Sequence, residues 1–138
     1  MKKRALVVDD NINNLLLEKD LLEIAGFLVF EAENASNGVD LARKEIPDVI
    51  IMDARLPDMS GVEAARILRL DKTTTHIPIV FVTASVMAEN RDELKKITNS
   101  LFIGKPIDTR MFAEEISQFI KLSAINIKKS DPGEVNNE

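Results

Sequence analysis

Short hydrophobic runs alternate with longer segments of helical periodicity along most of the chain. The runs are typical of β-strands and cover residues 5–8, 28–31, 49–52, 79–82 and 101–103. The segments between them repeat apolar residues three and four positions apart, as amphipathic helices do. Five strands alternating with five helices predict an α/β fold, a doubly wound parallel sheet with helices on both faces.

The residues at segment boundaries give approximate limits for the helices. We expect a last helix that begins after Asp108, and four earlier helices over residues 13–25, 36–44, 62–70 and 87–97. Gly26 is placed to end the first helix, because glycine readily adopts the left-handed conformation found just after a helix. Ser36 or Asn37 would cap the second helix through its side-chain oxygen.

The apolar pattern fades from Asn126 onward, where the residues become polar or helix-breaking. This composition predicts a disordered tail. We therefore expect one domain over residues 1–122, followed by a C-terminal helix extension and polar tail over residues 123–138. The second segment is several times too short for a DNA-binding output domain.

Composition narrows the classes of function. The 138 residues suit a single domain, and the net charge of -5 argues against direct DNA binding, because phosphate binding needs a basic face. The absence of cysteine excludes disulfides and thiolate metal sites, and one histidine cannot form a zinc site alone. No apolar stretch is long enough for a signal peptide or a membrane span, so we expect a cytoplasmic protein.

Acidic residues follow two of the hydrophobic runs. Asp9 and Asp10 come directly after the first run, and Asp53 follows the third. Each has an ordinary explanation, since aspartate often caps helices and Asp10 could cap the first one. If the first and third strands are neighbours, however, the three carboxylates meet at the edge of the sheet where such folds bind ligands. Their mutual repulsion would be relieved by a cation such as Mg²⁺, which prefers oxygen ligands.

A lysine and a threonine end two further strands. Lys105 could be an ordinary solvated lysine, but Pro106 restricts its backbone, which suggests a positioned side chain. Thr83 ends the fourth run and could be a simple strand residue or a helix cap. Its hydroxyl could also donate to an oxyanion bound at Asp53.

Five short motifs lie in order at these strand ends: VVDD at 7–10, MD at 52–53, PDMSG at 57–61, VTA at 82–84 and KP at 105–106. Together they resemble the receiver domain of bacterial and archaeal two-component response regulators, from about residue 3 to residue 122. The resemblance implies the flavodoxin-like strand order 2-1-3-4-5. It also implies a phosphorelay signalling domain rather than a conventional enzyme, although such domains assist their own phosphorylation and dephosphorylation.

The resemblance assigns roles around the acidic residues. Asp53 would be the phosphoacceptor. Asp9 and Asp10 would hold Mg²⁺, or Mn²⁺ in its place, together with Asp53 and the backbone carbonyl of Arg55. A histidine kinase or a phosphotransfer protein would donate the phosphoryl group from a phosphohistidine.

The same resemblance assigns the switch. Lys105 would bind a phosphoryl oxygen through a backbone in which the Lys105–Pro106 peptide bond is cis. Thr83 would be the switch hydroxyl and Phe102 the rotating aromatic, and their movement would change binding to an unknown downstream protein. The resemblance also suggests a monomer or a weak, phosphorylation-dependent dimer. Asn13, Asn14, Leu17 and Glu18 of the first helix would be candidates for kinase recognition.

The chain departs from the family pattern at a few positions. Thr98 and Asn99 occupy the turn before the fifth strand where relatives often carry Gly-Ala, which predicts an altered turn without loss of chemistry. Arg55 and Ser85 lie two residues past the phosphoacceptor and the switch hydroxyl, beside the path of attacking water. We expect them to tune the lifetime of the phosphoryl group.

Three other interpretations remain open at this point. A dehalogenase-like phosphatase also uses a strand-ending aspartate with Mg²⁺, but it needs a second acid where this chain has Arg55. A flavodoxin-like electron carrier is disfavoured by the absence of Trp and Tyr and of a phosphate loop after the first strand. A receiver-like binding module that works without phosphate is disfavoured by the intact acidic residues, Thr83 and Lys105.

Overall fold

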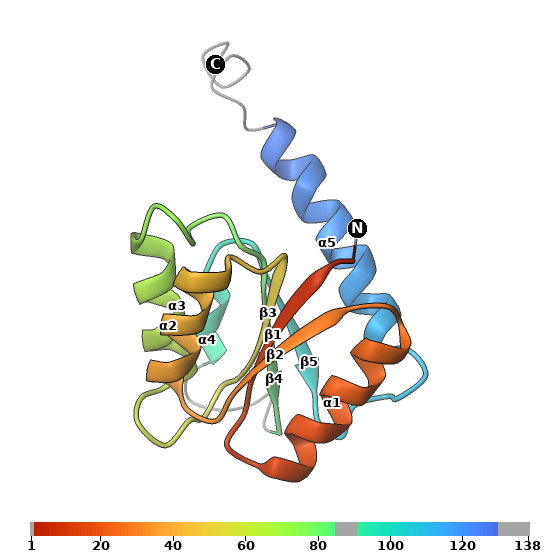
Figure 1. Ribbon diagram of the computed structural model, residues 1–138. Coiled ribbons are helices and arrows are strands. Elements are labelled where there is room, and N and C mark those ends of the chain that lie inside the picture. The colour runs from red at the N-terminus through yellow and green to blue at the C-terminus, as the bar shows by residue number, and fades with distance from the viewer. Residues whose placement is uncertain (1, 85–90, 130–138) are drawn as a thin grey trace.

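A five-stranded parallel sheet forms the centre of the molecule in a computed structural model that describes residues 2–84 and 91–129 (Figure 1). The strands follow the order β2-β1-β3-β4-β5 and all pair in parallel, as predicted. Their bounds are β1 Arg4–Val8, β2 Leu28–Ala32, β3 Val49–Asp53, β4 Ile79–Thr83 and β5 Ser100–Gly104.

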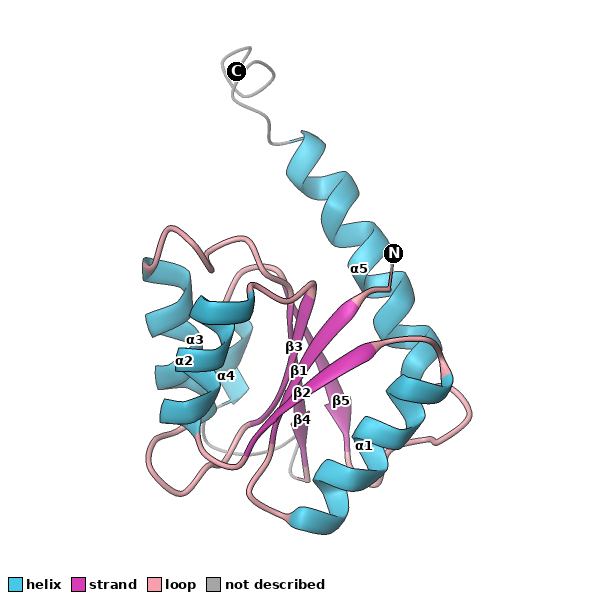
Figure 2. Ribbon diagram, in the orientation of Figure 1, coloured by secondary structure: helices cyan, strands magenta, loops and turns pink. Residues whose placement is uncertain are grey.

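Helices cover both faces of the sheet (Figure 2). The described helices are α1 Ile12–Ile24, α2 Ala35–Glu45, α3 Gly61–Leu70, α4 Arg91–Lys95 and α5 Phe112–Lys129. Helices α2, α3 and α4 lie on one face, and α1 and α5 on the other (Figure 1). This is the doubly wound arrangement that right-handed crossovers produce.

The helix ends confirm one sequence expectation about caps and correct two. Gly26 does follow α1 with a φ of 100°, as expected. The N-cap of α1 is Asn11 rather than Asp10, because the Asn11 side chain accepts a hydrogen bond from the Asn14 amide. The N-cap of α2 is Asn34, so the prediction of Ser36 or Asn37 was wrong. Both of those residues already lie in the first turn of α2.

Two helices differ in length from their sequence predictions. The part of α4 that the structure describes ends at Lys95, two residues earlier than expected, and residues 85–90 are outside the described residues. The amides of Lys96 and Ile97 then donate to carbonyls only three residues back, which tightens the chain into a turn. Helix α5 continues to Lys129, beyond the fading of the apolar pattern at Asn126.

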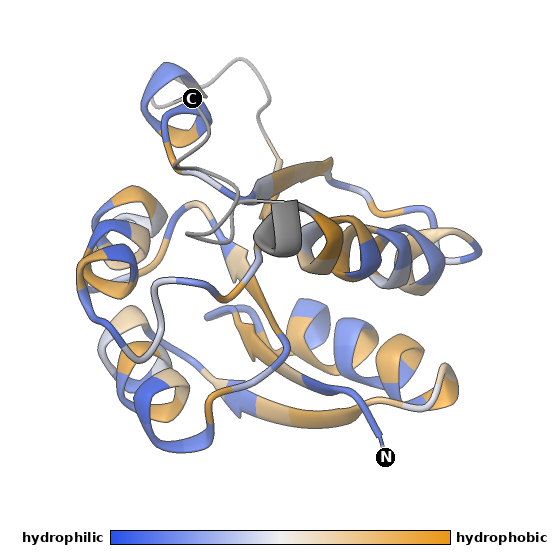
Figure 3. Cartoon of the chain, turned by 90° about the horizontal axis from the view of Figure 1, so that it is seen from above, coloured by the Kyte–Doolittle hydropathy of each residue, from blue (hydrophilic) through white to orange (hydrophobic). Residues whose placement is uncertain are grey.

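The buried residues form two clusters that the sheet separates. The cluster facing α2, α3 and α4 includes Leu6, Ile50 and Phe81, and the cluster facing α1 and α5 includes Val7 and Ile51. Hydrophobic residues line the strands, whereas much of the helical surface is polar (Figure 3). Because side chains alternate along a strand, each strand contributes to both clusters.

The same alternation decides where the strand-end residues point. Val7 and Ile51 face α1 and α5, so the residues two positions on, Asp9 and Asp53, face the same side. Ile103 belongs to that cluster as well, which places Lys105 with the two aspartates. The carboxyl ends of the strands, at the lower edge of the sheet in Figure 1, therefore gather opposite charges on one face.

Candidate functional site

The three aspartates of the sequence analysis meet at the carboxyl ends of β1 and β3. These strands pair directly, with Val8 opposite Met52, so the residues that follow are also neighbours. One carboxylate oxygen from each of Asp9, Asp10 and Asp53 lies within 4.8 Å of the others. Asp9 is only 1% exposed, whereas Asp10 is exposed and Asp53 is half-buried.

Lys105 reaches into this cluster from the end of β5. Its Nζ lies 3.0 Å from Oδ2 of Asp53 and 3.4 Å from Oδ2 of Asp9, and its side chain is 18% exposed. Burial lowers the pKa of Lys105, but the hydrogen bonds and charges of the two aspartates outweigh burial and leave that pKa raised. Lys105 is therefore held in its charged form.

The pKa of the buried Asp9 is set by competing effects. Burial raises the pKa of Asp9, and the Coulombic repulsion of Asp53 adds to the rise, while the Asn11 amide and Lys105 lower it. The net effect is a raised pKa, caused mainly by burial. Independently of that pKa, the cluster holds three carboxylates beside the one ammonium group of Lys105. A set of carboxylate oxygens with a shortage of positive charge fits a hard divalent cation such as Mg²⁺.

A pocket of about 320 Å³ opens beside the aspartates. Its lining contains Asp10, Asn11, Asn14, Asp53, Arg55, Thr83, Ala84 and Lys105. Thr83 is buried at the end of β4, and its carbonyl accepts a hydrogen bond of 2.8 Å from the Lys105 amide. The Lys105–Pro106 peptide bond is cis, as the family resemblance implied.

The loop between β3 and α3 forms one wall of the pocket. The Arg55 amide donates a 3.0 Å hydrogen bond to Oδ1 of Asp53, and Arg55 pairs with Ser60 in an antiparallel bridge. Gly61 closes the loop: a Cβ there would lie 2.9 Å from the Asp53 carbonyl oxygen. Only glycine permits this close approach.

Phe102 lies on the other side of the sheet from Lys105. Its ring packs edge-on against Phe81, with centroids 5.8 Å apart and an interplanar angle of 84°. It is half-buried against the cluster under α2, α3 and α4. Its expected rotation remains a prediction, and Ser85, the other expected lifetime residue, lies outside the described residues.

The turn before β5 contains Thr98 and Asn99, and its difference from the turn of relatives stays a prediction. Asn99 has a φ of 54°, in the left-handed region that asparagine tolerates better than most residues. The Arg69 guanidinium donates hydrogen bonds to the carbonyls of Thr98, Asn99 and Ile77. The sequence gives no signal for this contact, because an arginine near the end of a helix usually lies in solvent.

Glu18 occupies an unexpected place. It was expected to face a partner kinase, and this was wrong: Glu18 is 3% exposed and lies in the inward row of α1 with Leu15 and Leu22. Burial raises the pKa of Glu18 to about 8, with further repulsion from Asp9. The three- and four-residue spacing of this row was a signal in the sequence. Asn13 and Leu17 are exposed, and Asn14 lines the pocket.

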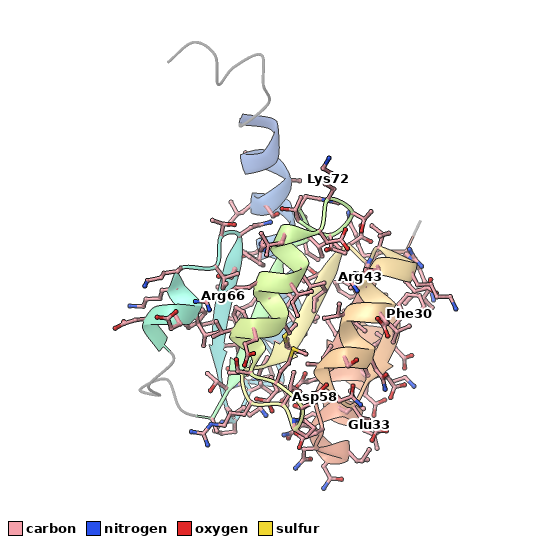
Figure 4. The ribbon with its side chains drawn as sticks, turned by 90° about the vertical axis from the view of Figure 1, so that its left-hand side faces the viewer. Phe30, Glu33, Arg43, Asp58, Arg66 and Lys72 are labelled. Carbon is pink, nitrogen blue, oxygen red and sulfur yellow. The ribbon has the colours of Figure 1, made fainter. Side chains whose placement is uncertain are left out.

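Charged residues on the outer surface of α2 and α3 form ion pairs outside the pocket. Arg43 of α2 pairs with Asp71, and Arg66 of α3 pairs with Glu93 of α4 (Figure 4). These pairs are largely exposed, and exposed ion pairs contribute little to stability.

None of the helices described in the structure is long and apolar enough to cross a membrane.

Comparisons with known proteins agree with this geometry. A family model for the response regulator receiver domain matches residues 5–117. The polar-differentiation response regulator DivK of Brucella anthropi is 35% identical over 120 residues, which cover 87% of this chain and 98% of DivK.

Solved structures give the same result. A CheY-like receiver domain protein from Methanospirillum hungatei has a TM-score of 0.82 and 28% identity, covering 91% of this chain and 99% of that one. The receiver domain of a sensor histidine kinase from Pseudomonas aeruginosa has a TM-score of 0.80 and 25% identity, covering 88% of this chain and 99% of that one. In that structure a magnesium ion is coordinated in the active site cleft.

Proposed function

The chain belongs to the response regulator receiver domain family, and from this premise we propose that Asp53 accepts a phosphoryl group from a phosphohistidine. The donor would be a histidine kinase or a phosphotransfer protein in the cytoplasm. The observation that supports this most directly is the position of Asp53. Asp53 lines a pocket together with Asp10, Lys105 and the end of β4, and its carboxylate lies close to that of the buried Asp9.

Asp53, Lys105 and Thr83 each have one role in the proposed phosphoryl transfer. An oxygen of the Asp53 carboxylate attacks phosphorus, so a new P–O bond forms while the P–N bond to the donor histidine breaks and the imidazole nitrogen keeps the electron pair. Lys105, already 3.0 Å from Asp53, binds a phosphoryl oxygen. The Thr83 hydroxyl donates a hydrogen bond to a second phosphoryl oxygen, so the negative charge of the phosphoryl group is stabilised at two of its oxygens.

The oxygen-rich cluster fits a divalent cation. Asp9, Asp10, Asp53 and the backbone carbonyl of Arg55 would hold Mg²⁺ or Mn²⁺. When bound, such an ion neutralises charge shared by the carboxylates and the phosphoryl oxygens. The proposal is supported by the donor chemistry and by the charge balance, in which three carboxylates lie beside the one ammonium group of Lys105.

The switch follows from the new charge on Asp53. A phosphoryl group there is a strong acceptor, so it draws the Thr83 hydroxyl toward it. Phe102 packs beside β4 and would turn into the space that Thr83 leaves. The altered surface around α4, β5 and α5 would then bind or release a downstream protein.

Intact mass spectrometry tests the proposal. We expect wild-type protein incubated with acetyl phosphate and Mg²⁺ to gain about 80 Da, the mass of one phosphoryl group on a carboxylate nucleophile. Omission of Mg²⁺ or the substitution Asp53→Asn should abolish the gain. A folded wild-type protein that gains no mass with Mg²⁺ present would contradict the proposal and favour a receiver-like module that works without phosphate.

A further inference from the structure

Asp58 links the β3–α3 loop to the start of α2. Its Oδ1 accepts a hydrogen bond of 2.9 Å from the Ala35 amide, and its Oδ2 accepts one of 2.9 Å from the Ser36 amide. Asp58 lies on the loop beside the first turn of α2 (Figure 4). An exposed residue of one loop thus uses both carboxylate oxygens to hold a helix that begins 23 residues earlier.

These bonds complete the first turn of α2. The Asn37 amide donates to the Asn34 side chain at 2.8 Å, and the Gly38 amide donates to the Asn34 carbonyl at 3.1 Å. The other two amides of the turn are those that Asp58 accepts. The two hydrogen bonds keep the pKa of Asp58 below its usual value, so the carboxylate stays ionised at the positive end of the helix.

Helix α2 is a firm anchor for the loop. Gly38 packs so closely on β1 that a Cβ would lie 2.8 Å from Cγ2 of Val8. Val8 directly precedes Asp9, one of the clustered carboxylates. The start of α2 is therefore fixed relative to the strand that supplies the buried acid of the site.

The β3–α3 loop, which Asp58 links to α2, also forms one wall of the pocket beside Asp53. The Arg55 amide, three residues earlier, donates to Oδ1 of Asp53 at 3.0 Å. The Arg55–Ser60 bridge spans Asp58, so movement of Asp58 away from α2 would disturb the backbone on both sides. The Arg55 backbone is thus held from Asp53 at one end and from α2 at the other.

We propose that Asp58 is a positioning residue that fixes the Arg55 backbone beside Asp53 and thereby sets the affinity of the acidic cluster for a divalent cation. The proposal rests on the proposed function, in which the Arg55 carbonyl is a metal ligand. Asp58 itself touches neither the cation nor the phosphoryl group.

The direct test is a titration with Mn²⁺ followed by electron paramagnetic resonance, which measures free Mn²⁺ without any phosphoryl transfer. We expect Asp58→Asn to weaken binding by about tenfold, the lower end of what removal of an outer-shell partner costs at metal sites. Asp58→Glu keeps both oxygens and should recover part of the loss. Glu33→Gln is the matched control, because it removes the same charge from the exposed loop before α2.

Two outcomes of this titration would overturn the proposal. Either Asp58→Asn binds Mn²⁺ as tightly as wild type, or Glu33→Gln weakens binding equally, which would reduce the effect to general charge. Thermal unfolding of each variant, compared with wild type, identifies loss of binding that comes from loss of the fold.

A second measurement works without metal and separates this proposal from the proposed function. Hydrogen exchange of the Arg55 amide, followed by nuclear magnetic resonance, reports its bond to Asp53 directly. We expect faster exchange at Arg55 in Asp58→Asn than in Glu33→Gln. Unchanged exchange would overturn the positioning role even if wild type is phosphorylated, whereas a wild type that is never phosphorylated leaves this readout intact.

Discussion

The two faces of the sheet solve different problems. Under α2, α3 and α4 the buried cluster is apolar, from Leu6 through Ile50 to Phe81. Under α1 and α5 the apolar cluster gives way toward the carboxyl edge to Asp9, Asp53, Lys105 and Glu18. The apolar face therefore stabilises the fold, whereas the other face contains buried charged groups that lower stability at the site of the proposed chemistry.

The largest expected effect comes from the apolar face. Phe81→Ala removes a fully buried ring and its contact with Phe102, so we expect the free energy of unfolding to fall by about 3–5 kcal/mol. Urea denaturation measures this loss. Leu70→Ala is the control, since Leu70 is 86% exposed and its truncation should change stability little. A Phe81→Ala variant as stable as that control would contradict the division between the faces.

The next effect concerns Glu18 on the charged face. Burial raises the pKa of Glu18 to about 8 from its ordinary value of 4.5, so between these pH values the folded state holds a proton that the unfolded state has lost. The contribution of Glu18 to stability therefore falls as pH rises through this window, by about 1.4 kcal/mol per pH unit.

Glu18→Gln should remove this dependence. Between pH 5.5 and pH 7.5 we expect wild type to lose about 2–3 kcal/mol more stability than Glu18→Gln does, by urea denaturation at both values. Parallel pH profiles for the two proteins would show that Glu18 is ionised in the fold.

A smaller effect should follow from removing the ammonium group of Lys105 from the acidic cluster. Lys105→Met leaves Asp9 and Asp53 without their ammonium partner, so a divalent cation should bind several times more tightly. Titration with Mn²⁺ at pH 7 measures the change. Lys121→Met removes the same charge from an exposed position on α5 and should leave affinity unchanged. Weaker binding in Lys105→Met would contradict the charge balance described above.

The smallest expected effect concerns Arg55, which is exposed at the rim of the pocket. We expect its side chain to shield the phosphoryl group, so Arg55→Ala should lose phosphate a few times faster, by roughly 1 kcal/mol or less of barrier. The decay of phosphorylated protein after removal of the donor measures this. Lys72→Ala removes one charge at the far end of α3 (Figure 4) and should decay like wild type. Equal decay of Arg55→Ala and wild type would end the shielding hypothesis.

The sequence was sufficient for the architecture and for much of the site. Hydrophobic runs separated by helical periodicity require a layered α/β fold, and parallel strands bring their carboxyl ends to one edge. That geometry is why Asp9, Asp53 and Lys105 could be placed together before any coordinates. The cis bond before Pro106 followed from family resemblance rather than from the pattern.

What the sequence did not reveal depends on contacts between distant residues. Asn34 and Ser36 cap helices almost equally well, so local preference could not choose between them. Asp58 holds amides that are 22 and 23 residues away, and no local motif encodes such a bond. Glu18 was missed because charged residues are usually exposed, although its spacing from Leu15 and Leu22 placed it on the buried row.

The alternation of side chains along β3 has a consequence for how this protein can change by insertion or deletion. Loss of a single residue before Asp53 in β3 would move Asp53 to the place of Met52, on the Phe81 side of the sheet, and bring Ala54 to the pocket, while every acidic residue stayed in the sequence. Shortening an exposed loop by one residue carries no such reversal. The number of residues in the strand is therefore as necessary to the chemistry as the identity of its last residue.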